Sequence, residues 1–419
     1  MRDKSGRPVV VVTGMGVVTS LGAGKDDNWK KLTGGESGIK SITRFPTDGL
    51  KTRIAGTVDF IDIDAMSAPV LTLRLAELAG QEAVSQSGLG NAVPGPLFLA
   101  TPPVEIEWDQ RRVLAKTAGA NGPVSYDDLL RVSAQHPDYH SLFMFGSVAD
   151  HLADKFGTRG SPISLSTACA SGTSAIQLGV EAIRRGEADA ALCIGTDGSV
   201  NVESLVRFSL LSALSTQNDP PQGAAKPFSK NRDGFVMAEG AGALVLESLE
   251  NAQARGARIL GVLAGCGEMA DSFHRTRSSP DGKPIIGCIQ RALDDAGVAP
   301  EQIDYINPHG TGTPENDKME ALGVAAVFGE RAAKIPMSSN KSMVGHTLSA
   351  AGAVEAVFTL LTMQNGRLPP TINYNVPDPA IPLDVVPNKA RDADVKYAIS
   401  NSFGFGGQNV SLVMAREPA

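Results

Sequence analysis

Cysteine is scarce in this sequence. The chain has 419 residues and only four cysteines, at positions 169, 193, 266 and 288, with no Cys-x-x-Cys pair and no metal-ligand spacing. Such a pattern indicates free thiols in a reducing compartment. We therefore expect a cytoplasmic protein that has neither a disulfide framework nor a metal site.

Long hydrophobic runs and an excess of positive charge are missing as well. The apolar stretch 9–12 follows Arg2 and Lys4, but Thr13 and Gly14 end it too early for a signal-peptide core. No other run has the length of a membrane span. The formal net charge of −7 argues against nonspecific nucleic-acid binding. We expect neither a membrane span nor a nucleic-acid partner.

Glycine and apolar residues, in contrast, are abundant: 45 residues are glycine and 42% are apolar, enough for a large core with many turns. Hydrophobic patterns predict strands at 9–13, 162–166, 190–197, 242–246, 259–265, 305–307, 335–337, 397–400 and 410–414. They predict helices at 171–185, 283–296, 316–328 and 348–361. This alternation predicts an α/β fold with a mainly parallel sheet covered on both faces. A polar hinge at 247–258 divides the chain into residues 1–257 and 258–419.

The most informative motif is Ser-Thr-Ala-Cys-Ala-Ser-Gly at 166–172, which places Cys169 between a predicted strand and a predicted helix. A thiol at a helix N-terminus lies beside unpaired N–H groups and the positive end of the helix dipole. We expect this position to lower the pKa of Cys169 and to make it a nucleophile. Taken alone, the motif also fits a buried structural cysteine.

Three glycine-rich turns in the second half carry further polar side chains, in places where side chains commonly perform chemistry. His309 lies in Asn-Pro-His-Gly-Thr-Gly-Thr-Pro, and Lys341 and His346 lie in Asn-Lys-Ser-Met-Val-Gly-His-Thr. The third turn, Phe-Gly-Phe-Gly-Gly at 403–407, precedes the final strand. Each turn alone is a weak signal, whereas this ordered set is a strong one.

With these motifs the chain resembles the β-ketoacyl-acyl-carrier-protein synthases of the thiolase superfamily, most closely the type II elongating enzymes. The resemblance also covers the opening VVVTGMGVVTSLG and RDGFVMAEGAGALVLE at 232–247. It implies a duplicated α-β-α-β-α five-layer fold. The implied reaction is a decarboxylating Claisen condensation of an acyl group held on Cys169 with malonyl-acyl-carrier protein. Phosphopantetheine then belongs to the carrier protein, and the enzyme needs no cofactor.

Each motif residue takes a role from the resemblance. His309 and His346 stabilise the enolate, and Lys341 completes the catalytic set. The backbone N–H groups of Cys169 and Phe405 form the oxyanion hole, with Phe403 as a gate. The resemblance implies that Thr311 and Thr313 form hydrogen bonds with the pantetheine arm. It also implies that Asp317 and Glu320 hold Lys341. For the last four residues, turn chemistry and an exposed helix face are the alternatives.

The family also implies a homodimer, to which the apolar stretch 141–145 contributes; that stretch also suits an intrachain core. Two other functions remain open. One is a ketosynthase subunit of a polyketide or specialised-lipid pathway, and the other is an acyl-binding partner subunit that does not condense. The intact Cys169, His309, His346 and Lys341 argue against the second. A thiolase is disfavoured because Cys266 and Cys288 lie outside any matching motif.

The chain departs from the family where substrate and carrier are contacted. Residues 97–108, in the atypical segment 97–135, stand where the family has a glycine-rich loop that shapes the acyl pocket, so the preferred chain length cannot be transferred. A docking arginine is replaced by Gln217, and the basic cluster at 65–85 is reduced to Arg74. Arg111, Arg112 and Lys116 are a candidate replacement patch, or else a solvated charged face. These departures predict an unusual acyl chain, specialised or long, or an unusual carrier, with drift in a redundant copy as the alternative.

Overall fold

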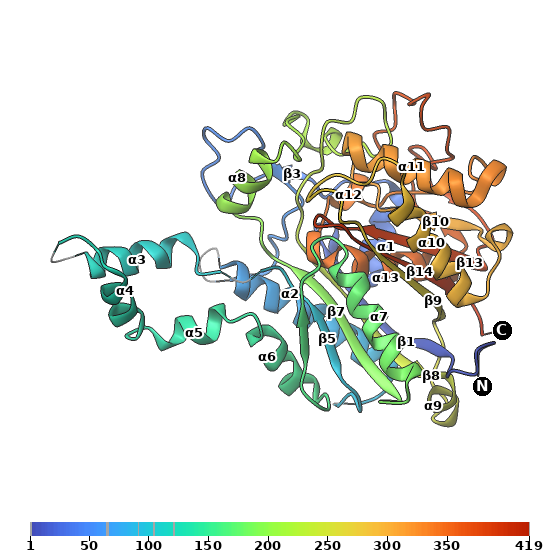
Figure 1. Cartoon of the computed structure of the whole chain (residues 1–419), viewed down its shortest axis with the longest axis horizontal. Helices are drawn as coiled ribbons and strands as arrows, with labels where there is room; N and C mark the ends of the chain where they lie inside the picture. The colour runs from blue at the N-terminus through green and yellow to red at the C-terminus, as the bar shows by residue number, and fades with distance from the viewer. Residues whose placement is uncertain (1, 64–66, 91, 104, 120–121, 419) are drawn as a thin grey trace.

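The computed structural model describes residues 2–63, 67–90, 92–103, 105–119 and 122–418. Within this part of the chain, one ten-stranded sheet runs through the molecule in the order β10-β13-β14-β9-β1-β8-β7-β5-β6, and β2 pairs with β1 at its side (Figure 1). Its strands are β1 (Val10–Thr19), β2 (Gly22–Ala23), β5 (Leu97–Ala100), β6 (Ile163–Leu165), β7 (Ala190–Asp197), β8 (Gly240–Ser248), β9 (Gly261–Ala270), β10 (Tyr305–Asn307), β13 (Tyr397–Phe403) and β14 (Gln408–Ala415). Two short ribbons pair β3 (Lys40–Ser41) with β4 (Ile54–Ala55), and β11 (Arg367–Leu368) with β12 (Arg391–Asp392).

The sheet consists of two copies of one strand pattern. In the first half, the five main strands lie side by side in the order β6-β5-β7-β8-β1. Numbered by their position along the chain, this is third, second, fourth, fifth, first. From β9 onward the order is β10-β13-β14-β9, and Met337 forms a parallel bridge to Ile306 on β10. The bridge occupies the place of a third strand, so the two halves match. Residues 335–337 thus form a single bridge in place of the predicted strand.

The prediction of a mainly parallel sheet is wrong. Parallel pairing occurs at β5–β6, β5–β7 and β10–β13, whereas β1–β8, β1–β9, β7–β8, β13–β14 and β14–β9 are antiparallel. The physical reason is that β13 and β14 are joined by a tight glycine turn, which only antiparallel neighbours allow. The β7–β8 pair in the first half is antiparallel as well, although residues 198–239 connect its two strands.

Helices form three layers around the strands, which gives the expected five-layer arrangement. The central layer is α7 (Ser171–Arg184) and α13 (Ala351–Asn365), which contact each other and strands of both halves. The outer layers are α2 (Ala68–Ser87) over β1, β7 and β8, and α10 (Lys283–Ala296) over β9 and β14, with α11 (Pro314–Phe328) packed on α10. The two central helices approach so closely at Gly352 that a Cβ there would lie only 1.9 Å from Thr173 Oγ1. Glycine at this position therefore permits the contact.

Most predicted elements are present with shifted ends. Strand β1 continues through a bulge near Thr13 to Thr19 instead of ending at Gly14. The predicted hinge at 247–258 contains α9 (Leu249–Ala254). The remaining helices are α1 (Lys25–Gly34), α3 (Trp108–Ala118), α4 (Tyr126–Ser133), α5 (Pro137–Phe143), α6 (Ser147–Phe156), α8 (Val202–Leu210) and α12 (Lys341–Val344), with 3₁₀ turns at Pro221–Gly223, Pro300–Gln302, Gly329–Arg331 and Leu348–Ala350. None of the helices in the described ranges combines the length and apolarity needed to cross a bilayer.

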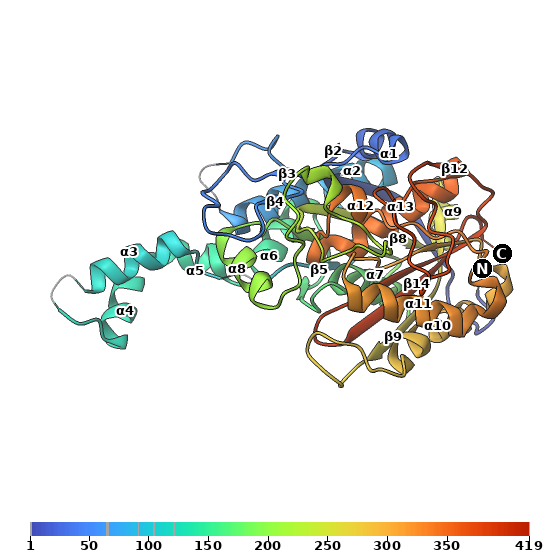
Figure 2. The same ribbon diagram turned by 90° about the horizontal axis from the view of Figure 1, so that it is seen from above.

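Helices α3, α4 and α5 form an arm that extends away from the body of the molecule (Figure 2). The arm follows β5, so the atypical segment 97–135 is one buried strand, a connection and two helices. Val104, Ala120 and Asn121 of this segment lie outside the described residues. The arm exposes several large apolar side chains: Trp108, Val113, Val124, Tyr126, Leu130 and Met144.

Candidate active site

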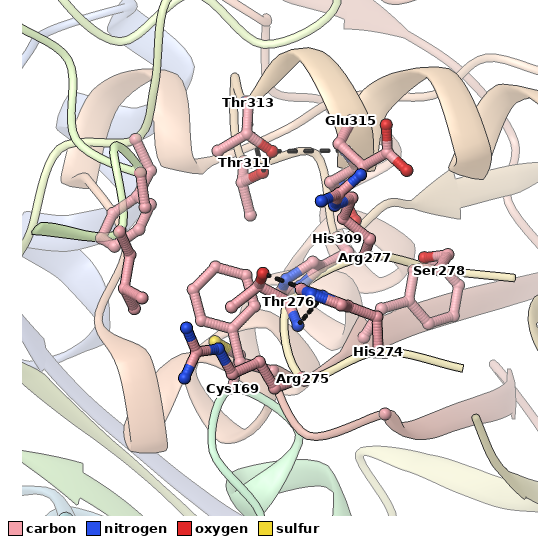
Figure 3. Close-up of a pocket in the computed structure, with 18 of the residues that line it drawn as sticks. Cys169, His274, Arg275, Thr276, Arg277, Ser278, His309, Thr311, Thr313 and Glu315 are labelled. Carbon is pink, nitrogen blue, oxygen red and sulfur yellow. Dashed lines mark hydrogen bonds between the residues drawn. The ribbon is translucent and has the colours of Figure 1, made fainter. Parts of the chain in front are cut away.

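A cavity of about 330 Å³ is lined by residues from each of the sequence motifs. Cys169, His309 and His346 line it, together with Thr311, Thr313 and Phe403 (Figure 3). These residues come from the first half and from three separate segments of the second half. The structure therefore brings together motifs that are far apart in the sequence.

Cys169 is placed by a strained turn between β6 and α7. Ala168, immediately before it, has a φ of +50°, a backbone conformation that costs a non-glycine residue energy. Ser171 stabilises the turn, since its hydroxyl accepts a hydrogen bond from Thr167 N–H and donates one to Ala168 O. The turn directs the thiol into the cavity, where Cys169 is 8% exposed. Sequence alone gave no sign of this strain.

Burial raises the pKa of the Cys169 thiol to about 11, against smaller opposing effects of the Phe405 N–H, which donates to the sulfur, and of the Lys341 charge. The expected lowering of this pKa is therefore wrong for the resting protein. The position before α7 is as predicted, but removal from water outweighs the nearby helix terminus. At neutral pH the thiol is protonated and must transfer its proton when it reacts.

His309 lies directly after β10, in a loop held by buried charges. Glu320 accepts hydrogen bonds from the N–H groups of His309 and Gly310, at 2.8 and 2.7 Å. Lys341 Nζ donates to His309 O at 2.7 Å. The imidazole is 2% exposed, and burial together with the Lys341 charge holds its pKa well below the ordinary value. His309 is therefore neutral at physiological pH.

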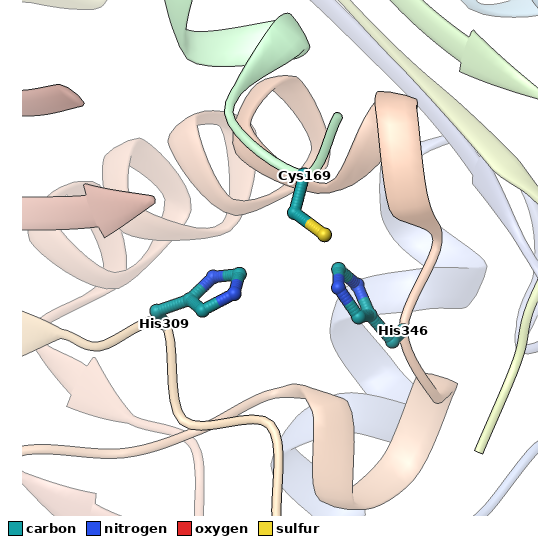
Figure 4. Close-up of side chains that lie close together, drawn as sticks. All are labelled: Cys169, His309 and His346. Atoms are coloured by element: carbon teal, nitrogen blue, oxygen red, sulfur yellow. The ribbon is translucent and has the colours of Figure 1, made fainter. Parts of the chain in front are cut away.

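His346 faces His309, with ring centroids 5.3 Å apart and planes nearly perpendicular (Figure 4). Its Nδ1 accepts a hydrogen bond from Leu348 N–H at 3.2 Å, which assigns the proton to Nε2. Nε2 is buried and has no hydrogen-bond partner among the described residues. Burial and the Lys341 charge lower the pKa of His346 as well. The site thus presents a neutral imidazole with an N–H available to a substrate.

Lys341 pairs with Glu355 on α13, not with Asp317 or Glu320. Asp317 instead accepts hydrogen bonds from Phe228 N–H and Gly312 N–H and lies 3.7 Å from Arg232. Both acids are fully buried, which excludes the exposed helix face. The assignment of these two acids to Lys341 is therefore wrong, because α11 turns them toward the backbone of the His309 loop. They hold that loop in place.

Sequence reasoning missed Glu355, although a signal was present. It is the only charged residue between His346 and Gln364, in a helix otherwise built from small and apolar residues. A buried carboxylate in such a helix needs a partner. The buried Lys341 is that partner, and burial raises the pKa of Glu355 to about 7.

The remaining predicted residues also lie at the cavity. Thr311 and Thr313 line one wall, with their hydroxyl oxygens 2.9 Å apart, and Thr313 caps α11 by accepting from Asn316 N–H. The Phe403 ring packs edge-on against His309, with centroids 5.9 Å apart. These contacts place Phe403 between the imidazole and the glycine turn.

Sulfur and nitrogen atoms of Cys169, His309 and His346 lie within 4.8 Å of one another. Zinc is bound by donor sets of this kind. The sequence spacing did not indicate the cluster, because the three residues come from separate segments. The Lys341 charge, which depresses the pKa of both imidazoles, also disfavours a cation here. We interpret the set as the catalytic groups of a thiol enzyme.

The proposed basic patch on α3 is only partly available. Arg111 forms ion pairs with Glu105 and Glu203, which neutralise it. Arg112 and Lys116 are exposed on the arm. Sequence reasoning did not single out residues 274–278, which line the cavity and include Arg275 and Arg277.

Family models match most of the chain. Residues 7–70 and 110–252 match the N-terminal domain of β-ketoacyl synthases, and residues 260–375 match the C-terminal domain. The chain belongs to the β-ketoacyl synthase family. Curated relatives include 3-oxoacyl-[acyl-carrier-protein] synthase 2 of Coxiella burnetii, 37% identical over 97% of this chain and 98% of the relative. The Staphylococcus aureus enzyme of the same name is 36% identical over the same shares.

Solved structures support the membership. A ketosynthase in complex with the acyl-carrier protein of its type II polyketide system, bound to a hexaketide, superposes with a TM-score of 0.89. It is 34% identical and covers 98% of this chain and 100% of that chain. A β-ketoacyl synthase from Burkholderia phymatum has a TM-score of 0.84 and 32% identity at the same coverage. This β-ketoacyl synthase family chain therefore has the thiolase-like fold.

Proposed function

We propose that the protein is an elongating condensing enzyme that joins an acyl chain on Cys169 to a malonyl group delivered by acyl-carrier protein, giving a β-ketoacyl chain longer by two carbons. The supporting observation is the convergence of one buried thiol and two neutral imidazoles in a single cavity. The names of the curated relatives agree with this reaction. Enzymes of this family need no cofactor of their own, because phosphopantetheine is attached to the carrier.

The first step transfers the acyl group from the carrier thioester to Cys169. The thiol proton moves to a neutral imidazole as sulfur attacks the carbonyl carbon; the carrier thiolate then leaves and takes that proton back from the imidazolium, so the ring is neutral again. Phe405 lines the same cavity as Cys169, and its N–H favours negative charge on the sulfur, so it is suited to stabilise the carbonyl oxygen as that oxygen becomes negative. We assign Phe405 N–H and Cys169 N–H to the oxyanion hole and Phe403 to the gate.

The second step forms the carbon–carbon bond. The malonyl group loses carbon dioxide, and the electron pair of the broken bond moves onto the thioester oxygen as an enolate. Imidazole N–H groups of His309 and His346 stabilise this oxygen, while burial, together with the Lys341 charge, keeps both rings neutral. The enolate carbon attacks the acyl group, and the Cys169 thiolate leaves. Thr311 and Thr313 are assigned to the pantetheine arm that delivers the malonyl group.

For the acyl chain we propose a general class and no defined length. Atypical residues follow β5, and the polar side chains of Glu105 and Glu107 replace part of a glycine-rich loop, which supports a specialised or long-chain lipid. A polyketide substrate is supported less well, because the curated relatives that match over 97% of the chain are named 3-oxoacyl-[acyl-carrier-protein] synthase 2 and not polyketide synthases. A non-condensing subunit is disfavoured by the complete catalytic set.

A turnover screen with acyl-carrier substrates of graded length tests the function. We expect condensation with malonyl-carrier protein and a clear maximum at one range of chain lengths. Failure to condense any acyl chain, with the protein folded, would contradict the proposal. Kinetics identical to those of an ordinary elongating synthase on medium chains would contradict the specialisation alone.

We propose that the enzyme is a homodimer and that the chain divides into halves at residues 257 and 258. Strand β6 is an edge of the sheet, and its Ile163 is 44% exposed. Met144 and Phe145 of the stretch 141–145 are also exposed, at 43% and 39%. An exposed apolar edge strand is a site for pairing with another chain.

A cytoplasmic location is supported by the four free cysteines.

A further inference from the structure

Two arginines at the mouth of the Cys169 cavity have no role in the reaction described above. Arg275 and Arg277 line the cavity and are exposed. Within the described residues, neither side chain forms an ion pair or a hydrogen bond. Most other arginines of the first and second halves are paired, for example Arg232 with Asp378 and Arg255 with Glu247. The mouth therefore carries two positive charges that are not neutralised.

The segment that carries these arginines is well anchored. Asp271 is buried, and its carboxylate accepts hydrogen bonds from Phe273 N–H and from the N–H and hydroxyl of Ser279. Its own N–H donates to Gly407 O at 2.7 Å. A Cβ on Gly407 would lie 1.9 Å from Asp271 O, so only glycine permits this approach. We call residues 271–279 the arginine loop.

The arginine loop is also joined to the turn that contains Phe405. Gly406 N–H donates to Arg275 O at 2.8 Å. The backbone of Arg275 is therefore held beside the turn that carries Phe405, at the same cavity as Cys169. Figure 3 shows residues 274–278 on one side of the cavity and Thr311 and Thr313 on the other.

We propose that Arg275 and Arg277 bind the phosphate of the pantetheine arm, an inference that rests on the proposed function. The thioester must reach Cys169, which is buried, so the opposite end of the arm lies where the cavity opens to solvent. Phosphate is the charged group at that end, and arginine binds it with two parallel hydrogen bonds. The lost docking arginine at Gln217 is then compensated by charge on a different segment.

The acidic residues around the mouth limit this charge but do not cancel it. The Asp271 carboxylate is satisfied by its own loop, and His274 Nδ1 accepts from Thr276 N–H. Glu315 is the other acid that lines the cavity, and within the described residues it forms no ion pair with either arginine. Removing the Glu315 charge should therefore strengthen phosphate binding.

The test compares malonyl-phosphopantetheine with malonyl-pantetheine, which lacks the phosphate, in a decarboxylation assay with the intact protein. We expect a higher kcat/KM for the phosphorylated thioester, and a preference that falls with rising salt concentration. Arg275→Gln and Arg277→Gln should each lower the preference by about fivefold, the upper range for an exposed charge pair. Arg258→Gln, an exposed arginine outside the cavity, is the matched control and should keep the preference. Glu315→Gln should increase it.

Equal use of the two thioesters by the wild type would overturn the inference alone. The same holds if the two arginine variants lower activity only with intact carrier protein, because the arginines would then contact the carrier surface. Inactivity of the folded wild type toward both thioesters would overturn the proposed function, and the inference with it. Retention of the phosphate preference in the Arg275→Gln, Arg277→Gln double variant would also contradict it.

Discussion

At the residue scale, the reactive thiol differs from a pre-ionised cysteine. Burial raises its pKa to about 11, so the thiolate fraction increases by about tenfold per pH unit below that value. We therefore expect the rate of Cys169 alkylation by iodoacetamide to increase from pH 7 to pH 9 without a plateau, measured by peptide mass mapping. Cys169 should react first, because Cys193 and Cys288 are fully buried and desolvation raises the pKa of Cys266 further, to about 12. A plateau near pH 7, or first labelling of Cys266 with activity retained, would contradict this.

We expect the two histidines to serve decarboxylation more than acyl transfer. In the proposed reaction each supplies one imidazole N–H to the enolate oxygen, so His309→Ala or His346→Ala should slow malonyl decarboxylation by roughly 100-fold. Acylation of Cys169, followed with a radiolabelled acyl thioester, should survive in part. His151→Gln on α6 is the control, since His151 lies outside the cavity and should leave both rates unchanged. Variants that lose acylation but decarboxylate normally would show that the roles are divided differently.

At the scale of elements, the buried Lys341–Glu355 pair joins α12 to α13. Glu355→Gln leaves an uncompensated buried ammonium, which typically costs about 3–5 kcal/mol of unfolding free energy. Urea unfolding should show this loss. A Lys341→Met, Glu355→Leu double variant should recover most of the stability, because neither charge is then buried alone, but not the activity. A single variant as stable as the wild type would mean that the pair is not buried in solution.

The sequence was sufficient to predict elements with strong periodicity and motifs with local meaning. Helix α10 and strand β10 have the predicted bounds, and each of the three glycine-rich turns lies at the cavity. Long-range properties were less accessible. Pairing direction depends on which strands become neighbours, so the sheet was wrongly expected to be mainly parallel. The partner of Lys341 and the pKa of Cys169 depend on burial, which no local pattern records.

At the scale of the whole molecule, we expect light scattering to report twice 43.6 kDa, the mass of the chain. Ile163→Lys places a charge on the exposed edge strand β6, and charged edge strands resist pairing. This variant should shift the mass toward a single chain. Val376→Lys, at an equally exposed apolar residue distant in sequence from β6, should not. A wild type that is monomeric at working concentration would contradict the dimer.

The repeated strand order has a consequence for how such a site could arise. Cys169 follows the third strand of the first half and precedes its central helix α7. Lys341 and His346 follow the bridge at Met337, which holds the third-strand place in the second half, and they precede the central helix α13. Cys169, Lys341 and His346 thus occupy the same connection in two copies. A duplicated ancestor would already have brought two identical loops face to face, and an enzyme required only that the copies diverge.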